Sequence, residues 1–153
     1  MDFRGKTVFI TGGSRGIGLA IVKKLASKGA NIIIAAKTTE PNPNLPGTIY
    51  SAAKEIEEIG GTCLPVPCDI RFESQLTTAV EQGVKKFGGI DICINNASAV
   101  APLPTEATQM KRYDLMQEIN TRGTFLTSKL CLPYLKKSTH AHILTLSPPL
   151  DID

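Results

Sequence analysis

The chain has 153 residues, of which 42% are hydrophobic and 20% charged, a mixture that predicts one globular domain and excludes a disordered chain, a collagen and a coiled coil. No apolar run approaches the roughly 20 residues that a membrane-spanning helix needs. The net charge of +3 comes from dispersed basic residues, which favours solvated helix surfaces over a nucleic-acid-binding face.

Five short apolar runs without regular polar alternation predict strands that are covered on both faces. In chain order they are Thr7–Ile10, Asn31–Ala36, Cys63–Val66 leading to Cys68, Ile90–Asn95 and His142–Leu146. Amphipathic stretches separate them, and strand–helix–strand units cross over right-handedly. The sequence therefore predicts an α/β fold, a Rossmann-type doubly wound parallel sheet of five strands in the order 3-2-1-4-5. We expect this sheet to be incomplete on its C-terminal side, with the fifth strand as an exposed edge.

Between the runs, apolar residues recur every three or four positions, as on the buried stripe of a helix. The first three stripes are Ile17, Ile21 and Leu25; Ile49, Ala53, Ile56 and Ile59; and Leu76, Val80, Val84 and Phe87. A long fourth helix is predicted from about Lys111 to Lys137, with its stripe at Leu115, Ile119, Leu126 and Leu130. The proline-rich stretch from Thr38 to Gly47 is predicted as a long loop after the second strand.

The four cysteines form no Cys-x-x-Cys pair, and three of them lie in or beside apolar runs. They are Cys63, Cys68, Cys93 and Cys131. This pattern favours reduced core thiols of an intracellular protein over disulfides or a zinc site. The two histidines, His140 and His142, have no carboxylate or thiol neighbour at ligand spacing, so no metal site is expected.

A glycine-rich loop follows the first predicted strand and leads into the first helix. From position 11 it reads Thr-Gly-Gly-Ser-Arg-Gly-Ile-Gly. Glycines in this context let the backbone approach a pyrophosphate, whose charge is stabilised by the helix N-terminus. A plain tight turn is the alternative. The predicted cofactor-binding residues of this loop are Gly12, Gly13, Ser14, Arg15, Gly16, Ile17 and Gly18.

The spacing Gly-x-x-x-Gly-x-Gly resembles the glycine motif of the short-chain dehydrogenase/reductase family. Asp69 stands where that family contacts adenine, and residues 95–98 (Asn-Asn-Ala-Ser) resemble its Asn-Asn-Ala-Gly motif, with Asn96 at the cofactor. Asn120 matches the helix asparagine that supports the family's proton relay. The resemblance covers the whole chain and implies a nicotinamide cofactor and a small carbonyl or alcohol substrate.

The choice of nicotinamide cofactor depends on the end of the second strand, where NAD-binding relatives place an acid that bonds the ribose 2′-hydroxyl. Here that region reads Ala36-Lys37, and Arg15 in the glycine loop could face the same ribose. Two cations and no acid favour a 2′-phosphate, hence NADP. Glu40 lies slightly further on, so NAD is kept as the alternative.

The catalytic residues implied by the resemblance are only partly present. The family uses a tyrosine acid/base, a lysine four residues later and a serine that orients the carbonyl. Ser147 is the candidate serine, although Pro148 occupies the place of the serine that is often catalytic in relatives, and no tyrosine follows it. The one Tyr-x-x-x-Lys, Tyr50 to Lys54, lies between the second and third strands and is interpreted as coincidental. With Asn120 and Ser147 as the only catalytic candidates, little or no turnover is expected from this chain alone.

Two functions are therefore expected as alternatives. The first is an NADP-dependent oxidoreductase acting on a carbonyl or alcohol, with a lipid-like substrate as one option. The second is a non-catalytic module that binds NADP or a partner, for example another copy through the long helix near 111–137. Further sequence matches lie in the proline-rich loop and in residues 36–38 (Ala-Lys-Thr), 47–50 (Gly-Thr-Ile-Tyr), 134–138 (Tyr-Leu-Lys-Lys-Ser) and 147–150 (Ser-Pro-Pro-Leu). In these segments the chain resembles a branch of the family in which the dehydrogenase domain precedes a sterol-carrier domain. Residues 1–153 would then be the N-terminal part of the dinucleotide-binding domain, with no trace of the second domain.

The resemblance also implies a peroxisomal or mitochondrial location. The chain shows no targeting signal of its own: the N-terminus has no cleavable apolar run, and its last residues, Asp151 to Asp153, are not a peroxisomal tripeptide.

Overall fold

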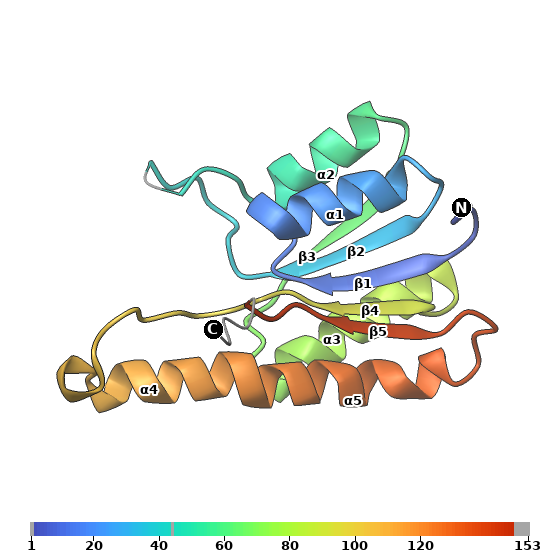
Figure 1. Ribbon diagram of the computed structural model, residues 1–153. Helices are drawn as coiled ribbons and strands as arrows, with labels where there is room; N and C mark the ends of the chain where they lie inside the picture. The colour runs from blue at the N-terminus through green and yellow to red at the C-terminus, as the bar shows by residue number, and fades with distance from the viewer. Residues whose placement is uncertain (1, 44, 149–153) are drawn as a thin grey trace, which may run out of the picture.

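The computed structural model describes residues 2–43 and 45–148, and it shows a five-stranded parallel sheet (Figure 1). The strands are β1 (Thr7–Thr11), β2 (Asn31–Ala36), β3 (Thr62–Pro67), β4 (Ile92–Asn95) and β5 (His142–Thr145). They pair in parallel in the order β3-β2-β1-β4-β5. The predicted α/β fold and strand order are therefore confirmed. The terminal residues 149–153, including those compared with a targeting tripeptide, lie outside the described residues.

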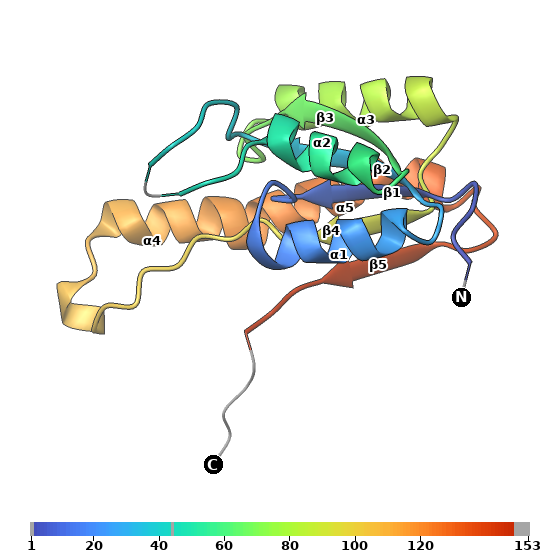
Figure 2. The same cartoon turned by 90° about the horizontal axis from the view of Figure 1, so that it is seen from above.

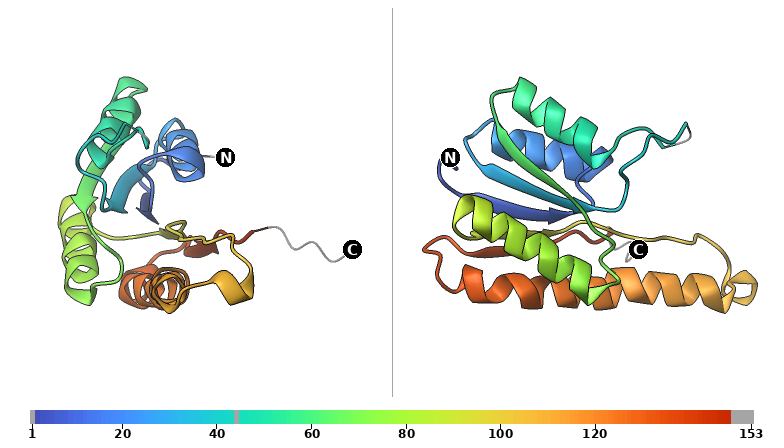
Figure 3. Two further views of the ribbon diagram at one scale, coloured as in Figure 1. Left: turned by 90° about the vertical axis from the view of Figure 1, so that its left-hand side faces the viewer. Right: turned by 180° about the vertical axis from the view of Figure 1, so that it is seen from behind.

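Helices cover both faces of the sheet, as expected for strands that are apolar throughout (Figure 3). One face carries α1 (Gly16–Ala26) and α2 (Ile49–Glu58), and the other carries α3 (Glu73–Phe87) and α5 (Thr124–Leu135). Because successive strand residues point to opposite faces, Ile32 and Ile34 of β2 share a core cluster with α1 and α2, whereas Ile33 belongs to the cluster with α3 and α5. All three isoleucines are fully buried.

The buried stripe of α1 lies one position later than predicted, and Ile21 and Leu25 are only partly buried against the core. Gly18, Val22 and Ala26 face the core, while Ile17 is 69% exposed. A Cβ at Gly18 would lie 2.6 Å from the carbonyl oxygen of Gly12, so the helix approaches the glycine loop along its small residues. This close approach turns Ile17 away from the core.

The prediction for Ile59 is also wrong, because α2 ends at Glu58 and the isoleucine after it is exposed. The other predicted stripe residues of α2 and α3 are buried or packed against the two core clusters.

The predicted long helix runs without interruption from Met110 to Leu135 but contains an unpredicted π-helical segment. It consists of α4 (Met110–Met116), the π segment η2 (Gln117–Gly123) and α5, after a short 3-10 turn η1 (Thr105–Ala107). At Gly123 the π segment packs directly on the side chain of Ile70, because a Cβ at this position would lie 2.6 Å from Cδ1 of Ile70.

The sheet ends at β5, whose four residues are all exposed, as predicted for an edge strand.

The four cysteines are free and buried, as predicted. Burial raises the pKa of both Cys63 and Cys68 to about 12, so these thiols stay protonated near neutral pH. Across residues 2–43 and 45–148, no group of three or more His, Cys, Asp and Glu side chains could hold a metal ion. Within the same described ranges, no helix is long and apolar enough to cross a membrane.

Candidate cofactor-binding site

A cleft of about 480 Å³ lies at the carboxyl ends of β1 to β4, the edge at which open parallel sheets bind ligands. In Figures 1 and 2 the loop after β2 and the first half of the long helix project beyond this edge, on either side of the cleft. Nine of the ten predicted cofactor-binding residues line it, namely Gly12, Ser14, Arg15, Gly16, Ile17, Gly18, Lys37, Asp69 and Asn96. The tenth, Gly13, faces the core instead, with Ile10 Cγ2 2.9 Å from the place of a Cβ.

The glycine loop is held tightly against the end of β4. Gly12 has a φ of +70°, and a Cβ there would lie 2.9 Å from Cα of Ala97. The side-chain amide of Asn96 donates to the carbonyl oxygens of Thr11 and Gly12, at 3.1 and 2.8 Å. The Thr11 hydroxyl oxygen accepts from the backbone N–H groups of Asn96 and Ala97, both at 3.1 Å. Asn96 thus shapes the loop by clamping its backbone, and Thr11 is a partner that the sequence analysis did not single out.

The N-terminus of α1 opens into the cleft without a capping side chain. The residue before the helix, Arg15, makes no side-chain capping bond, and the first turn contains no acidic residue. The first backbone N–H groups of a helix have no partner within the helix, and the helix dipole makes this end partly positive. The arrangement therefore suits the negative charge of a pyrophosphate.

Two cations stand where the adenosine ribose is expected. The Arg15 guanidinium donates from Nη2 to Thr38 Oγ1 at 2.6 Å and from Nη1 to the Leu45 carbonyl oxygen at 2.9 Å. Lys37, at the end of β2, is exposed and lines the cleft. Its ammonium group makes no ion pair within residues 2–43 and 45–148.

Asp69, the predicted adenine contact, has a partner that the sequence analysis missed. Arg71 binds both carboxylate oxygens, with Nε at 3.0 and 3.1 Å and Nη2 at 2.6 Å. These hydrogen bonds hold the pKa of the Asp69 carboxyl below its usual value, with a smaller contribution from the charge of Lys37. The Arg71 guanidinium also lies 3.7 Å from the Glu118 carboxylate. The backbone carbonyl oxygen of Arg71 accepts from the Arg122 guanidinium at 2.6 Å. Asp69 is therefore ionised and oriented, and the same arginine joins it to the long helix.

The two candidate catalytic residues lie apart from the cleft wall. Asn120, in the π segment η2, exchanges two hydrogen bonds with the backbone of Ala99, at 2.9 and 2.8 Å. It thereby fixes the segment after β4, and its neighbour Ile119 lines the cleft. Ser147 is exposed, its hydroxyl donates to the Pro148 carbonyl oxygen at 3.1 Å, and it is not among the residues that line the cleft.

The motif interpreted as coincidental lies on α2, away from the cleft. Tyr50 is exposed, Lys54 lies 3.9 Å from Glu58, and neither Tyr50 nor Lys54 is among the cleft-lining residues.

Comparisons with known proteins agree with this geometry. The family model described as short chain dehydrogenase matches residues 6–148. The chain is 61% identical to human hydroxysteroid dehydrogenase-like protein 2 and 62% identical to that of Xenopus laevis, over 97% of this chain and 36% of each relative. The chain thus spans about a third of the length of these curated relatives.

Solved structures of dehydrogenases also match this chain. A putative dehydrogenase from Xanthomonas campestris is 52% identical with a TM-score of 0.95, over 100% of this chain and 56% of that one. Carveol dehydrogenase from Mycobacterium avium, a structure in complex with NAD, is 26% identical with a TM-score of 0.81, over 93% of this chain and 54% of that one.

Proposed function

Since this chain belongs to the short-chain dehydrogenase/reductase family, we propose that residues 1–153 form the N-terminal, cofactor-binding part of an NADP-dependent oxidoreductase. Its reaction would transfer hydride between NADP(H) and a carbonyl or alcohol. The observation that carries the NADP assignment is the pair of cations, Arg15 and Lys37, at the adenosine end of a cleft where the strand end offers no acid.

Each part of the cleft has a proposed task. The uncapped start of α1 would receive the pyrophosphate, and Asp69 would accept from the adenine amino group. Asn96 would hold the glycine loop in the binding conformation, and Asn120 would hold the backbone at Ala99 beside the cleft. Bound NADPH would supply the hydride.

NAD is the competing cofactor, since the carveol dehydrogenase relative is in complex with NAD. Calorimetric titration of the chain with NADPH and with NADH decides between the two cofactors. We expect at least tenfold tighter binding of NADPH, because a charge-assisted hydrogen bond contributes roughly 1.5–3 kcal/mol. Equal dissociation constants would overturn the NADP assignment and leave the family assignment intact.

We propose that these 153 residues alone bind cofactor but turn over little substrate. Ser147 and Asn120 are the catalytic candidates, no tyrosine follows Ser147 in these 153 residues, and the Tyr50 motif lies away from the cleft. Lack of a positioned acid/base reduces rates by roughly 10²–10⁴-fold. NADPH consumption with aldehyde and ketone substrates should stay at background. Clear turnover that Tyr50→Phe abolishes would show that this tyrosine is the acid and that the proposed site is wrong.

A second function, association with another copy through the long helix, is favoured by apolar side chains on its surface. Met110, Tyr113, Phe125 and Leu132 are exposed, Phe125 to 69%. Exposed apolar residues grouped on one element mark association surfaces. Sedimentation at several protein concentrations would detect the pairing. A lipid-like substrate and a peroxisomal or mitochondrial location are proposed from the family resemblance alone.

A further inference from the structure

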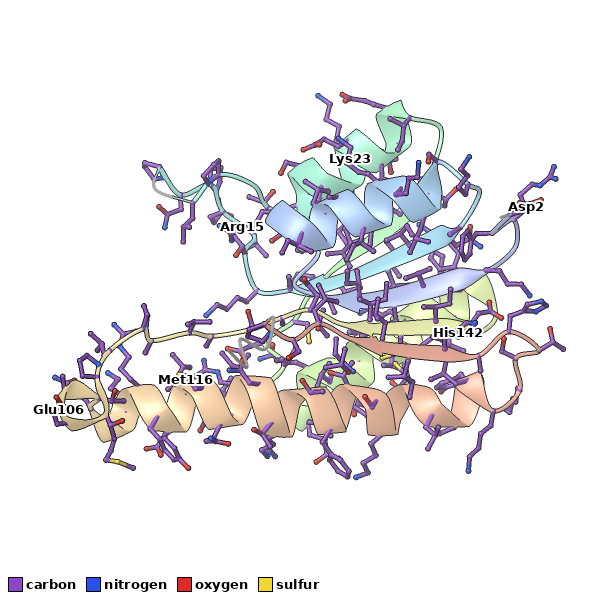
Figure 4. The ribbon with its side chains drawn as sticks, in the orientation of Figure 1. Asp2, Arg15, Lys23, Glu106, Met116 and His142 are labelled. Atoms are coloured by element: carbon purple, nitrogen blue, oxygen red, sulfur yellow. The ribbon has the colours of Figure 1, made fainter. Side chains whose placement is uncertain are left out.

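Arg15 joins the glycine loop to the loop that follows β2. Its guanidinium donates to Thr38 at the beginning of that loop and to the carbonyl oxygen of Leu45 near its end. Figure 4 shows Arg15 at the start of α1, beside this loop. We call this set of contacts, formed by Arg15, Thr38 and Leu45, the arginine clasp.

Two backbone features fix the geometry of the arginine clasp. The Thr38 carbonyl oxygen accepts from the N–H of Ile49, the first residue of α2, at 3.0 Å. Gly47 has a φ of +100°, and a Cβ there would lie 2.8 Å from the carbonyl oxygen of Ser14. The end of the loop therefore packs directly on the glycine loop, at the residue before Arg15.

The clasp uses only part of the hydrogen-bonding capacity of Arg15. A guanidinium carries five N–H donors in a rigid plane, and the clasp takes one from each terminal nitrogen. Three N–H donors of the guanidinium remain, while Thr38 and Leu45 fix the orientation of its plane. Arg15 and Thr38 both line the cleft, so the remaining donors are available beside the expected ribose.

We propose that Thr38 is a specificity-determining residue that acts through Arg15: it positions the guanidinium for the 2′-phosphate of NADP. This inference rests on the proposed NADP binding. A free arginine loses considerable rotamer entropy when it binds a phosphate, whereas a side chain already held in place has lost part of it beforehand. Thr38 therefore raises affinity for NADP without contacting it, and NAD, which has no 2′-phosphate, gains nothing.

The test is Thr38→Val, which keeps the shape of the side chain and removes the acceptor. We expect NADPH affinity to fall roughly three- to tenfold, as for the loss of one partly exposed charge-assisted hydrogen bond, and NADH affinity to change less than twofold. Thr39→Val is the matched control, since the adjacent threonine makes no side-chain hydrogen bond in the described part of the chain. Thr38→Ser, which restores the acceptor, should bind NADPH like the unaltered protein.

Combination with Arg15→Ala separates an indirect role of Thr38 from a direct one. If Thr38 acts through Arg15, Thr38→Val has no further effect on NADPH affinity once Arg15 is alanine. A persisting loss would mean that the threonine hydroxyl contacts the phosphate itself, and would overturn the proposal. The same loss from Thr39→Val would overturn it too. The proposed NADP preference itself fails if the unaltered protein binds NADPH no more tightly than NADH, with the same result for Arg15→Ala. In that case the role proposed for Thr38 fails with it.

Hydrogen exchange of the cofactor-free chain measures the clasp without any ligand. Thr38→Val should accelerate exchange at the Ile49 amide, whose acceptor is the Thr38 carbonyl oxygen, while amides of the β1 core keep their protection. By linkage, NADPH should slow exchange there more than NADH does. Unchanged exchange in Thr38→Val would contradict a positioning role even if cofactor affinity fell.

Discussion

The cation pair allows the sharpest test of cofactor choice: replacement of Arg15 and Lys37 by alanine, singly and together. Arg15 is held by two hydrogen bonds and keeps three donors, so it should account for most of the 2′-phosphate affinity. Lys37 is exposed, and solvent screening reduces its share. At roughly 1.5–3 kcal/mol for a charge-assisted hydrogen bond, discounted for exposure, the double variant should lose about 2–4 kcal/mol of NADPH binding.

Calorimetric titration with NADPH and NADH checks this value. The loss corresponds to roughly 30- to 1000-fold in the NADPH dissociation constant, whereas NADH binding should change little. Lys24→Ala is the control, because Lys24 is exposed on α1 and does not line the cleft. If both cofactors lost affinity equally, the two cations would act on a group common to NADP and NAD, and the reasoning about the ribose would be refuted.

Three further predictions concern other parts of the fold. Asp69→Asn should lower the free energy of unfolding at neutral pH. This loss relative to the unaltered chain should disappear as the pH falls through the lowered pKa of Asp69, because the ion pair with Arg71 exists only while the carboxyl is ionised. Urea unfolding at a series of pH values from 7 downward measures the loss. Gly83→Val should cost about 1–3 kcal/mol of unfolding free energy, since a Cβ would lie 2.3 Å from Cδ1 of the buried Ile33. Phe125→Glu should shift sedimentation toward the monomer, if the long helix mediates pairing.

Each of these has an outcome that contradicts it. If the difference between Asp69→Asn and the unaltered chain did not decrease at all as the pH falls through the acid range, the aspartate would stabilise by something other than its charge. Gly89→Ala, where nothing lies within 4 Å of the added Cβ, should be nearly neutral, and an equal loss there would refute the packing argument. Unchanged sedimentation of Phe125→Glu would remove the long helix as the pairing surface.

The fold could be predicted because its signals are local. Uniform apolar runs indicated strands covered on both faces, and the helical spacing between them indicated the crossovers. The errors in the stripes arose where packing depends on a distant partner. Ile17 fits the helical period but is exposed, because the close approach of Gly18 to the glycine loop sets the rotation of α1. The π segment had no local signal, and its last residue, Gly123, packs on Ile70.

Nine of the ten cofactor-binding residues predicted from the sequence line the candidate cleft, but the contacts that hold them could not be predicted. The glycine loop and Lys37 could be found from their order along the chain. The partners of Arg15 lie 23 and 30 positions away, and no periodicity indicates such a pair. Arg71 lies only two residues from Asp69, yet Asp-x-Arg occurs without pairing, so its role became visible only through the geometry.

The connections explain how the cleft can be preformed although its walls come from separate parts of the chain. On one side, Arg15 fixes the loop after β2 to the start of α1. On the other, Arg71 fixes the segment after β3 to the long helix through Glu118 and accepts from Arg122. Each arginine holds one wall while remaining beside the place where an anion or an adenine is expected. Arg15 lines the cleft itself, and Arg71 holds Asp69, which lines it. Substitutions at either arginine should therefore change cofactor affinity and local exchange together, whereas a residue that only contacts the cofactor should change affinity alone.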